Sequence, residues 1–453
     1  MDQLEPYSAP WWLDRLITAL AGKQAHYELL DRYHRSDPPL PPGPAKGRNP
    51  AFDYLRKKAR VNWADLIVES VVERMTVVGF SSGPDNGSQK ADADAWKIWQ
   101  GNDLDTGSVM LHRTKATLGD AYVIVGDIDE TIGVPRVTCE DPRDTIGAAD
   151  PIDRRTLVAA LKVFIDDVAG VDRAYVYLAG EVHRATRPRG RNRKVLSYDS
   201  KGWIWEEPEY LGHDRVPVVW FPNRADLKGR VMGEFEHVID DLDRINLLVL
   251  QRVQIAVLQA FRQRAIKGEL PEKDAAGNAI DYNVLFSSDP AALWQLPPGV
   301  DMWESAGVDL TPILESVMAD VRELAGRTRT PLYYLYPNEG GSAEGAVTQR
   351  EALIFRSGAR ITETSGPWEM VQSIALEVMG KTPPSDMETL WLPPSLATEA
   401  ERYDAATKAL GAGMTWREVM SEVLQLSPQT IDRMAAEHAA AGTPVPGTAQ
   451  AGA

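Results

Sequence analysis

A long stretch without proline constrains the fold of this chain more than any other feature. Residues 231–267 carry no proline and predict one continuous helix, about 50 Å long at about 1.5 Å per residue. Acidic residues occupy its first turns and basic residues follow, which complements the helix dipole. Beyond residue 245 the apolar positions cover more than one face. A helix of this kind must pack against neighbours on several sides.

The most apolar part of this stretch, residues 245–261, does not predict a membrane span. Five polar side chains interrupt it: Asn246, Gln251, Arg252, Gln254 and Gln259. A span of the lipid core does not tolerate so many uncompensated polar groups. We therefore expect a helix buried against other protein, and no membrane among the partners.

The region before this helix combines helices with strands. Helical patterns at 11–35, 63–78, about 90–100 and 104–118 come first. From 121 to 222, short runs rich in Val, Ile, Tyr and Trp are separated by Gly, Pro, Asp and Asn turns. Consecutive strands joined by short turns favour antiparallel meanders over a doubly wound sheet. The predicted fold class is therefore α+β.

A small module and a second helix follow the long helix. Residues 268–308 are rich in turn residues and have room for two or three short strands. Thr311 as N-cap, Pro312 at the first helical position and Gly326 past the end then predict a helix over 309–327. A β module is thus expected between two helices.

The C-terminal third begins with a loop and continues as helices. The loop, 328–345, leads into a helix from about 343 that is predicted to break at Gly366–Pro367. Capping-box patterns at 398–401 and 415–418, with Ser427–Pro428 as a further helix start, predict a small three-helix unit. Residues 443–453 are uncharged and are expected to be a disordered tail.

Glycine-rich loops that open helices often bind phosphate, but this one is predicted not to. It contains no Lys, and Glu339 and Glu344 would repel phosphate where backbone amides could receive it. The sequence MGKT at 379–382 matches the end of a nucleotide-binding loop. However, Ala375 stands where that motif needs glycine, and prolines follow where it needs a helix. We interpret MGKT as a helix C-cap.

No sequence pattern typical of catalysis or metal binding is present. The carboxylates of Asp240, Asp241 and Asp243, and those of Asp127 and Asp129, lack ligand spacing. The seven histidines form no HxH or HExxH pair, and the chain has no GxSxG motif. We expect no enzymatic activity, no cofactor and no metal.

The net charge of the chain indicates how strongly it can bind nucleic acid. The net charge of -16 argues against a surface built to hold DNA tightly, because DNA affinity comes mainly from Lys and Arg. One basic run, 183–194, stands out; it either contacts phosphates or forms a solvated loop or an intersubunit ion-pair patch. Its basic residues are Arg184, Arg187, Arg189, Arg191, Arg193 and Lys194.

The cellular compartment follows from the cysteine count and the first residues. Cys139 is the only cysteine, so no intramolecular disulfide can form. The sequence MDQLEPYSAPWW lacks the basic and apolar regions of a signal peptide. Both features predict synthesis in a reducing cytoplasm.

The order of these elements resembles the portal proteins of long-tailed, siphovirus-type bacteriophages. The stretches most similar to portal proteins from phages of actinobacteria are NWADLIVESVVERMTVVGF (62–80), GEFEHVIDDLDRINLLVLQRVQIAVLQAFRQRAIKG (233–268) and LYPNEGGSAEGAVTQRE (335–351). The resemblance covers nearly the whole chain.

Carried over by position, the resemblance implies the following parts: a wing at 1–230 and about 346–382, stem helices at 231–267 and 309–327, a clip at 268–308, a tunnel loop at 328–345, and a helical crown at 383–442. Tyr333, Tyr334 and Tyr336 either pack the base of the loop or face the channel. The loop residues expected at the DNA channel are Asn338, Glu339, Gly340, Gly341, Ser342, Glu344 and Gly345.

The resemblance also implies a function. Portal proteins form a dodecameric ring at one capsid vertex, and double-stranded DNA passes along its axis, weakly bound, during packaging and ejection. The implied partners are the large terminase subunit, an adaptor or head-completion protein, and the major capsid and scaffolding proteins. The protein would be made in the host bacterial cytoplasm and reside in the virion. Two alternatives are another virion structural protein and a nucleotide-dependent enzyme that uses the 338–345 glycine loop.

Overall fold

The chain folds into two compact units in the computed structural model. Unit 1 comprises Met1–Pro38, Asn62–Ile239 and Ala325–Ala453, and unit 2 comprises Pro39–Val61 and Asp240–Leu324. The structure describes residues 5–42, 50–85, 88–189, 195–260, 264–268, 270–273, 277, 280–282, 301–304, 307–336, 343–395, 399–424, 426 and 428–441.

The helices described in the N-terminal part of unit 1 are α1 (Ala9–His34), α3 (Trp63–Val72), α4 (Ala93–Gly101) and α5 (Leu104–Leu118), with two strands between α3 and α4. Helix α1 starts at Ser8, whose side chain accepts a hydrogen bond from the Trp11 amide. Helix α3 is shorter than predicted, because residues from Val77 onward pair with a strand from the far end of the chain. No local sequence pattern predicts this strand pairing.

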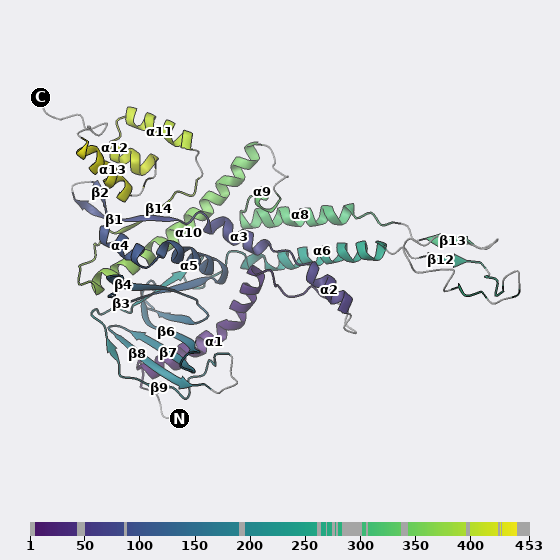
Figure 1. The fold of residues 1–453 in the computed structure, drawn as a ribbon, viewed down its shortest axis with the longest axis horizontal. Helices are drawn as coiled ribbons and strands as arrows, with labels where there is room; N and C mark the ends of the chain where they lie inside the picture. The colour runs from purple at the N-terminus through teal and green to yellow at the C-terminus, as the bar shows by residue number, and fades with distance from the viewer. Residues whose placement is uncertain are drawn as a thin grey trace. The chain divides into compact units, whose positions relative to one another are not determined.

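The described part of unit 1 also contains three antiparallel sheets (Figure 1), which confirms the mixed helix and sheet class. The first has the order β14-β1-β2, with β1 (Val77–Asp85), β2 (Ser88–Ala91) and β14 (Glu388–Trp391). The second has the order β11-β3-β4, with β3 (Asp120–Asp129), β4 (Val134–Glu140) and β11 (Val218–Pro222). The third has the order β10-β8-β7-β6-β5, with β9 on β8. Its strands are β5 (Thr145–Ala149), β6 (Leu157–Asp166), β7 (Val171–Leu178), β8 (Glu181–Pro188), β9 (Ile204–Trp205) and β10 (Glu209–Tyr210).

An aromatic core joins distant parts of the sequence. Trp368 of α10 (Ala343–Val378) is fully buried, and its ring centroid lies 4.9 Å from those of Trp99 and Phe221. Aromatic pairs at this spacing add to the stabilisation from buried area. Helix α10 thereby packs on β3 and β11, while α1 packs its apolar face on the third sheet.

Helix α10 is continuous, so the predicted break at Gly366–Pro367 is wrong. Thr364 and Trp368, on either side of the proline, are fully buried. Their packing holds the helix together although Pro367 cannot donate its backbone hydrogen bond. The predicted C-cap is confirmed, because Gly380 has a φ of 71° and the Lys381 amide donates to Leu376 O.

Four helical segments form the C-terminal part of unit 1: α11 (Glu399–Gly411), α12 (Trp416–Glu418), η2 (Val419–Val423) and α13 (Pro428–Ala440). The predicted capping box between Thr415 and Glu418 is present. The segment 383–442 is not purely helical, however, because β14 pairs with β1. The predicted tail, 443–453, lies outside the described residues.

Unit 2 contains α2 (Pro50–Lys58), α6 (Ile239–Ala260), β12 (Arg264–Lys267), β13 (Asp301–Glu304) and α8 (Thr311–Thr328). Helices α6 and α8 lie side by side, with the β12–β13 hairpin beyond their ends (Figure 1). Arg244 of α6 pairs with Asp320 at 3.2 Å and with Glu323 at 3.2 Å on α8. Residues 39–61, expected with the N-terminal part, belong here, and the Val61 amide donates to Asn246 Oδ1 at 2.9 Å.

The long helix is shorter at both ends than 231–267. At its start, a Cβ on Gly233 would lie 2.5 Å from Thr117 O, and the Glu234 amide donates to Ala116 O at 2.7 Å. These contacts hold the chain against α5, and a short 3-10 turn, η1 (Glu236–Val238), precedes α6. At its end, Arg264–Lys267 pair with β13. Within the part of the chain that the structure describes, no helix has the length and apolar character needed to cross a membrane.

Candidate functional site at the helix junction

The described part of unit 1 contains a buried charge cluster at the point where the chain passes to and from unit 2. Its centre is the Glu234 carboxylate, five residues before α6 begins. Arg356 of α10 donates to Glu234 Oε2 from Nε at 2.9 Å, and Asn223 Nδ2 donates to Oε1 at 3.0 Å. Arg360, one turn further along α10, also donates to Oε1. We call Glu234, Arg356, Arg360 and Asn223 the helix junction.

Arg356 extends the helix junction to two further segments. Its Nη1 donates to the carbonyl of Thr328, the last residue of α8, at 2.7 Å, and its Nη2 donates to the carbonyl of Ile67 in α3 at 3.0 Å. The carbonyls at a helix C-terminus have no partner within the helix, so the guanidinium supplies one. One side chain therefore fixes the residues before α6, the end of α8, and α3 relative to α10.

Electrostatics keep the helix junction charged. Burial alone would raise the pKa of Glu234, but the guanidinium groups of Arg356 and Arg360 outweigh it and lower that pKa to about 2. Burial lowers the pKa of Arg356 from its ordinary value. Replacing a buried ion pair with apolar groups is often neutral or stabilising, so the role of such a cluster is positional.

A second buried cation lies beside the helix junction. Lys115 of α5 is 1% exposed, and its Nζ donates to Thr364 Oγ1 of α10 at 2.5 Å. Burial lowers the pKa of Lys115 to about 8. Polar groups buried in this way are normally paired, as here. The contact holds α5 against α10.

The tunnel-loop residues lie mostly beyond the described part of the chain. Asn338, Glu339, Gly340, Gly341 and Ser342 fall outside the described residues, and Glu344 and Gly345 begin α10. The residues just before the loop belong to the described part of the chain. They form α9 (Leu332–Leu335), and the Tyr334 hydroxyl accepts a hydrogen bond from Arg74 at 2.8 Å. The ring of Tyr336 lies 5.7 Å from that of Trp63. Tyr334 and Tyr336 thus contact residues in and beside α3, as expected of side chains that pack the base of the loop.

The described half of the basic run is engaged in contacts within the chain. Arg184 pairs with Glu209, and Arg189 pairs with Asp167 at 2.7 Å. Arg187 is buried; it pairs with Asp172 at 2.9 Å, and its guanidinium stacks 4.3 Å from the ring centroid of Trp203. Arg184 and Arg187 thus link β8 to β10 and β7, and Arg189 contacts the turn between β6 and β7. Arg191, Arg193 and Lys194 lie outside the described residues.

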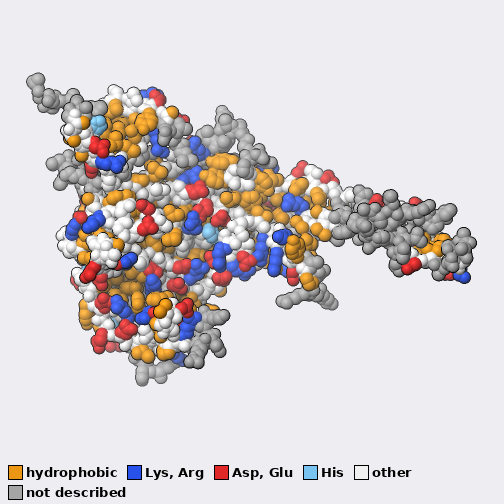
Figure 2. All heavy atoms as spheres, in the orientation of Figure 1, with side chains coloured by type: hydrophobic (Ala, Val, Ile, Leu, Met, Phe, Trp, Pro, Cys, Tyr) orange, Lys and Arg blue, Asp and Glu red, His pale blue; other side chains and the backbone are white. Residues whose placement is uncertain are grey.

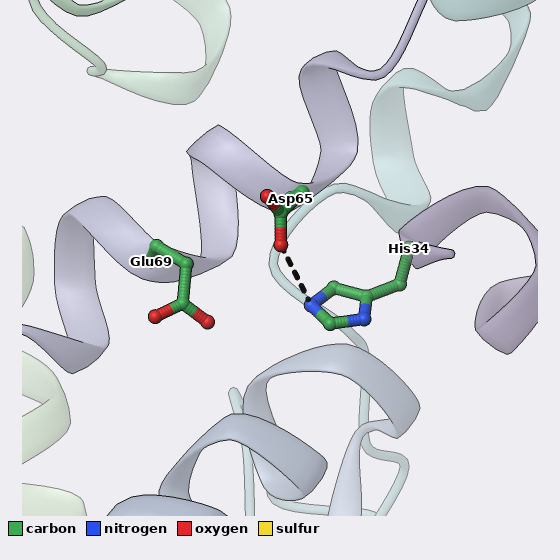
Figure 3. A group of neighbouring side chains, drawn as sticks. All are labelled: His34, Asp65 and Glu69. Atoms are coloured by element: carbon green, nitrogen blue, oxygen red, sulfur yellow. Dashed lines mark ion pairs between the residues drawn. The ribbon is translucent and has the colours of Figure 1, made fainter. Parts of the chain in front are cut away.

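The structure brings together one group of metal-ligating side chains that the sequence did not indicate. His34 at the end of α1 and Asp65 and Glu69 on α3 point toward one another (Figure 3). One ligand atom from each lies within 4.8 Å of the others. The only local signal is the spacing of Asp65 and Glu69, four residues apart on one helix face. The Asp241 carboxylate, considered above as a ligand, is buried and pairs with Arg244 at 3.3 Å.

Comparison with known proteins agrees with the arrangement of a helix, hairpin and helix inserted into an α+β unit. A family model described as "Phage portal protein, SPP1 Gp6-like" matches residues 15–306. The chain belongs to the phage portal protein family. It is 27% identical over 375 residues to the portal protein of Mycobacterium phage D29, covering 78% of this chain and 73% of that one. It is also 27% identical over 380 residues to the portal protein of Mycobacterium phage L5, with the same coverage.

Portal proteins are structural proteins of the virion, and the function of this chain is that of a phage portal. The expected resemblance to portal proteins from phages of actinobacteria is thereby confirmed. A solved chain from the neck of an empty GTA particle covers 88% of this chain, with 12% identity and a TM-score of 0.47. The helix junction did not follow from the sequence, because Glu234 and Arg356 stand 122 residues apart.

Proposed function

We propose that copies of this portal protein close into a ring, and that double-stranded DNA passes along the axis of that ring at one capsid vertex. The supporting observation is the apolar surface of unit 2. Val257 on α6 and Leu314 on α8 are 40% and 43% exposed, and Val308 and Trp303 are each 56% exposed. Hydrophobic side chains are visible at the surface of the α6 and α8 region (Figure 2). Large apolar side chains exposed on paired helices suit contact with a neighbouring copy. In a closed ring, the same helices of neighbouring copies cover it.

The charge of the chain suits passage of DNA. Each phosphate contact made by Lys or Arg adds affinity and slows sliding. The chain carries 65 acidic and 49 basic residues, and the 338–345 loop contains no basic residue. The three described arginines of the basic run are already paired with carboxylates. A duct with this composition binds DNA weakly and lets it move.

In this proposal the parts of the chain take the roles that the family implies. Helices α6 and α8 form the stem, and the chain between them, with the β12–β13 hairpin, forms the clip. Unit 1 supplies the wing, residues 328–345 the tunnel loop, and the segment 383–442 the crown. The clip receives the large terminase subunit during packaging and an adaptor or head-completion protein afterwards. Major capsid and scaffolding proteins contact the outer parts.

Native mass spectrometry of the purified chain tests ring formation. Twelve copies of the 50.0 kDa chain have a mass of about 600 kDa. The double variant Val257→Glu/Leu314→Glu should shift this species toward monomers, because it places carboxylates in the subunit contact. Val168→Glu is the control, since Val168 is fully exposed in the β6–β7 turn of unit 1. Monomers alone from the unaltered chain, across salt and protein concentrations, would overturn the proposal.

The two alternatives predict different results. A nucleotide-dependent enzyme would bind ATP in calorimetry, and changing Gly340 and Gly341 to bulkier residues would abolish that binding. Another virion structural protein would show no annular particle with a central channel in negative-stain images. An annular particle that binds no ATP supports the portal ring.

A further inference from the structure

We propose that His34, Asp65 and Glu69 bind one divalent transition-metal ion of the zinc class, which links the end of α1 to α3. The three side chains come from two helices of unit 1 and face one another (Figure 3). This site is separate from ring formation and DNA passage. It gives the protein a ligand that neither its family membership nor its proposed function supplies.

The geometry suits a small cation. His34 Nε2 lies 3.3 Å from Asp65 Oδ1, and the three ligand atoms lie within 4.8 Å of one another. Ligand atoms about 2.1 Å from a tetrahedral zinc ion stand about 3.4 Å apart. The pair formed by His34 and Asp65 is already at this spacing. A shift of the Glu69 carboxylate that keeps its contact with Arg113 would bring its oxygen, which lies within 4.8 Å of the other two ligand atoms, to the ion.

The ring nitrogen of His34 that faces the carboxylates is available to a cation. Its Nε2 atom is buried and makes no hydrogen bond, since the approach to Asp65 lacks hydrogen-bond geometry. Nε2 faces the Asp65 carboxylate at 3.3 Å, and the Glu69 carboxylate lies on the same side. A cation bound between the three groups would satisfy all of them.

The surroundings hold Glu69 in position. Arg113 of α5 donates to both of its oxygens, with Nη2 at 2.9 Å from Oε2. Each carboxylate oxygen has two lone pairs, so Glu69 can accept from Arg113 and still bind a metal. Such an outer partner fixes the orientation of a metal-binding carboxylate. Its positive charge also opposes the cation, so the affinity should be lower than in a site built only of anions.

The ligand set determines the class of metal. One imidazole nitrogen with two carboxylate oxygens suits Zn²⁺, Co²⁺ or Mn²⁺ better than Ca²⁺ or Mg²⁺, which prefer oxygen alone. Three protein ligands leave at least one position for water. On α1 the ligand is the last helical residue, and the Asn62 side chain already donates to His34 O at 3.0 Å. The ion would therefore reinforce an existing contact between these two helices.

Cobalt absorption and zinc calorimetry on the full-length, untagged chain test the site. After treatment with chelator, the chain should bind one Co²⁺ with a visible absorption band, and Zn²⁺ should displace it and raise the unfolding temperature. His34→Gln and Asp65→Asn should each weaken zinc binding by more than about a hundredfold, because even removing a group behind a ligand weakens binding about 10- to 100-fold. Circular dichroism checks that both variants fold.

His26→Gln is the matched control. His26 also faces a carboxylate, Glu236, with Nε2 3.1 Å from Oε1. Among the described residues, however, only the His34 group brings three such ligands together. This variant should bind Co²⁺ and Zn²⁺ as the unaltered chain does. If the unaltered chain shows no cobalt band, or if folded His34→Gln binds zinc equally well, the three residues form an ion pair only.

Discussion

Removing the charge of Glu234 should destabilise unit 1 more than any surface change. Glu234→Gln keeps the shape of the side chain but withdraws the anion from between two guanidinium groups. Arg360 keeps a partner in Glu363, at 3.0 Å. Arg356 is only 6% exposed, and Glu234 is the one carboxylate with which it forms an ion pair in the described part of the chain. Breaking a buried pair by removing one member costs about 3–5 kcal/mol. We expect a loss of this size in the free energy of unfolding.

The lowered pKa of Glu234 gives a second value for the contribution of its charge to the free energy of unfolding. Its value in the folded chain is about 2, against 4.5 for the free group, a difference worth about 3 kcal/mol. Because the folded value is the lower one, the stabilisation is complete above pH 4.5 and is lost as the pH falls from 4.5 toward 2. The difference between the unaltered chain and Glu234→Gln should therefore shrink across that window.

Urea unfolding followed by tryptophan fluorescence measures both effects, since Trp368 and Trp99 lie in the core of unit 1. Glu323→Gln is the control. Glu323 pairs with Arg244 at 3.2 Å but its side chain is 56% exposed, so its loss should cost less than about 1 kcal/mol. A cost below about 1 kcal/mol for Glu234→Gln, or a difference that does not change with pH, would refute this account of the helix junction.

Three further predictions concern other parts of the chain. The pKa of Lys115 is about 8 in the folded chain against 10.5 for the free group, so its buried charge lowers the stability of the folded state below pH 8. As the pH rises from 8 to 10.5, the free energy of unfolding of the unaltered chain should increase by up to about 3 kcal/mol relative to that of Lys115→Met. A difference in urea unfolding that stays constant across this range would contradict the prediction. Gly233→Ala should cost about 1–3 kcal/mol because its Cβ would meet Thr117 O, whereas Gly358→Ala in the open middle of α10 should stabilise by up to about 1 kcal/mol. Deleting Glu339–Gly345 should leave ring formation intact, as seen by negative stain, and reduce the DNA packaged; normal packaging would remove any role for the loop.

Local patterns predicted those elements whose stability is local. The turn residues between 121 and 222 and the alternating strands gave antiparallel pairing, and Thr311–Pro312 marked the start of α8. The predicted helix 231–267 is longer than α6. At its start, Gly233 packs closely against the carbonyl of Thr117, a residue more than a hundred positions earlier in the chain. The helix does not break at Pro367, because the buried side chains on either side of the proline stabilise the helical conformation. Both errors come from tertiary contacts that a single sequence does not display.

The candidate sites were hidden for the same reason. The helix junction joins residues from three separate segments, and His34 meets Asp65 only because α1 folds back against α3. One signal was present. Arg356 and Arg360 stand four residues apart on α10, and Arg356 lies between the buried residues Leu353 and Ser357. Charged residues on a buried helix face require a partner elsewhere in the chain.

The same contacts explain why the helix junction uses charge. Apolar side chains of similar volume would fill the space at equal or better stability. They would remove the hydrogen bond that Arg356 donates to the carbonyl of Thr328 at the end of α8, and a hydrogen bond from a charged group contributes about 1.5–3 kcal/mol. Apolar side chains would also not fix the register of α10 against α3, whereas Arg356 donates a hydrogen bond to one specific carbonyl of α3, that of Ile67. Since α10 begins directly after the 337–342 segment, this guanidinium fixes the helix behind the loop to the end of α8 in a single register.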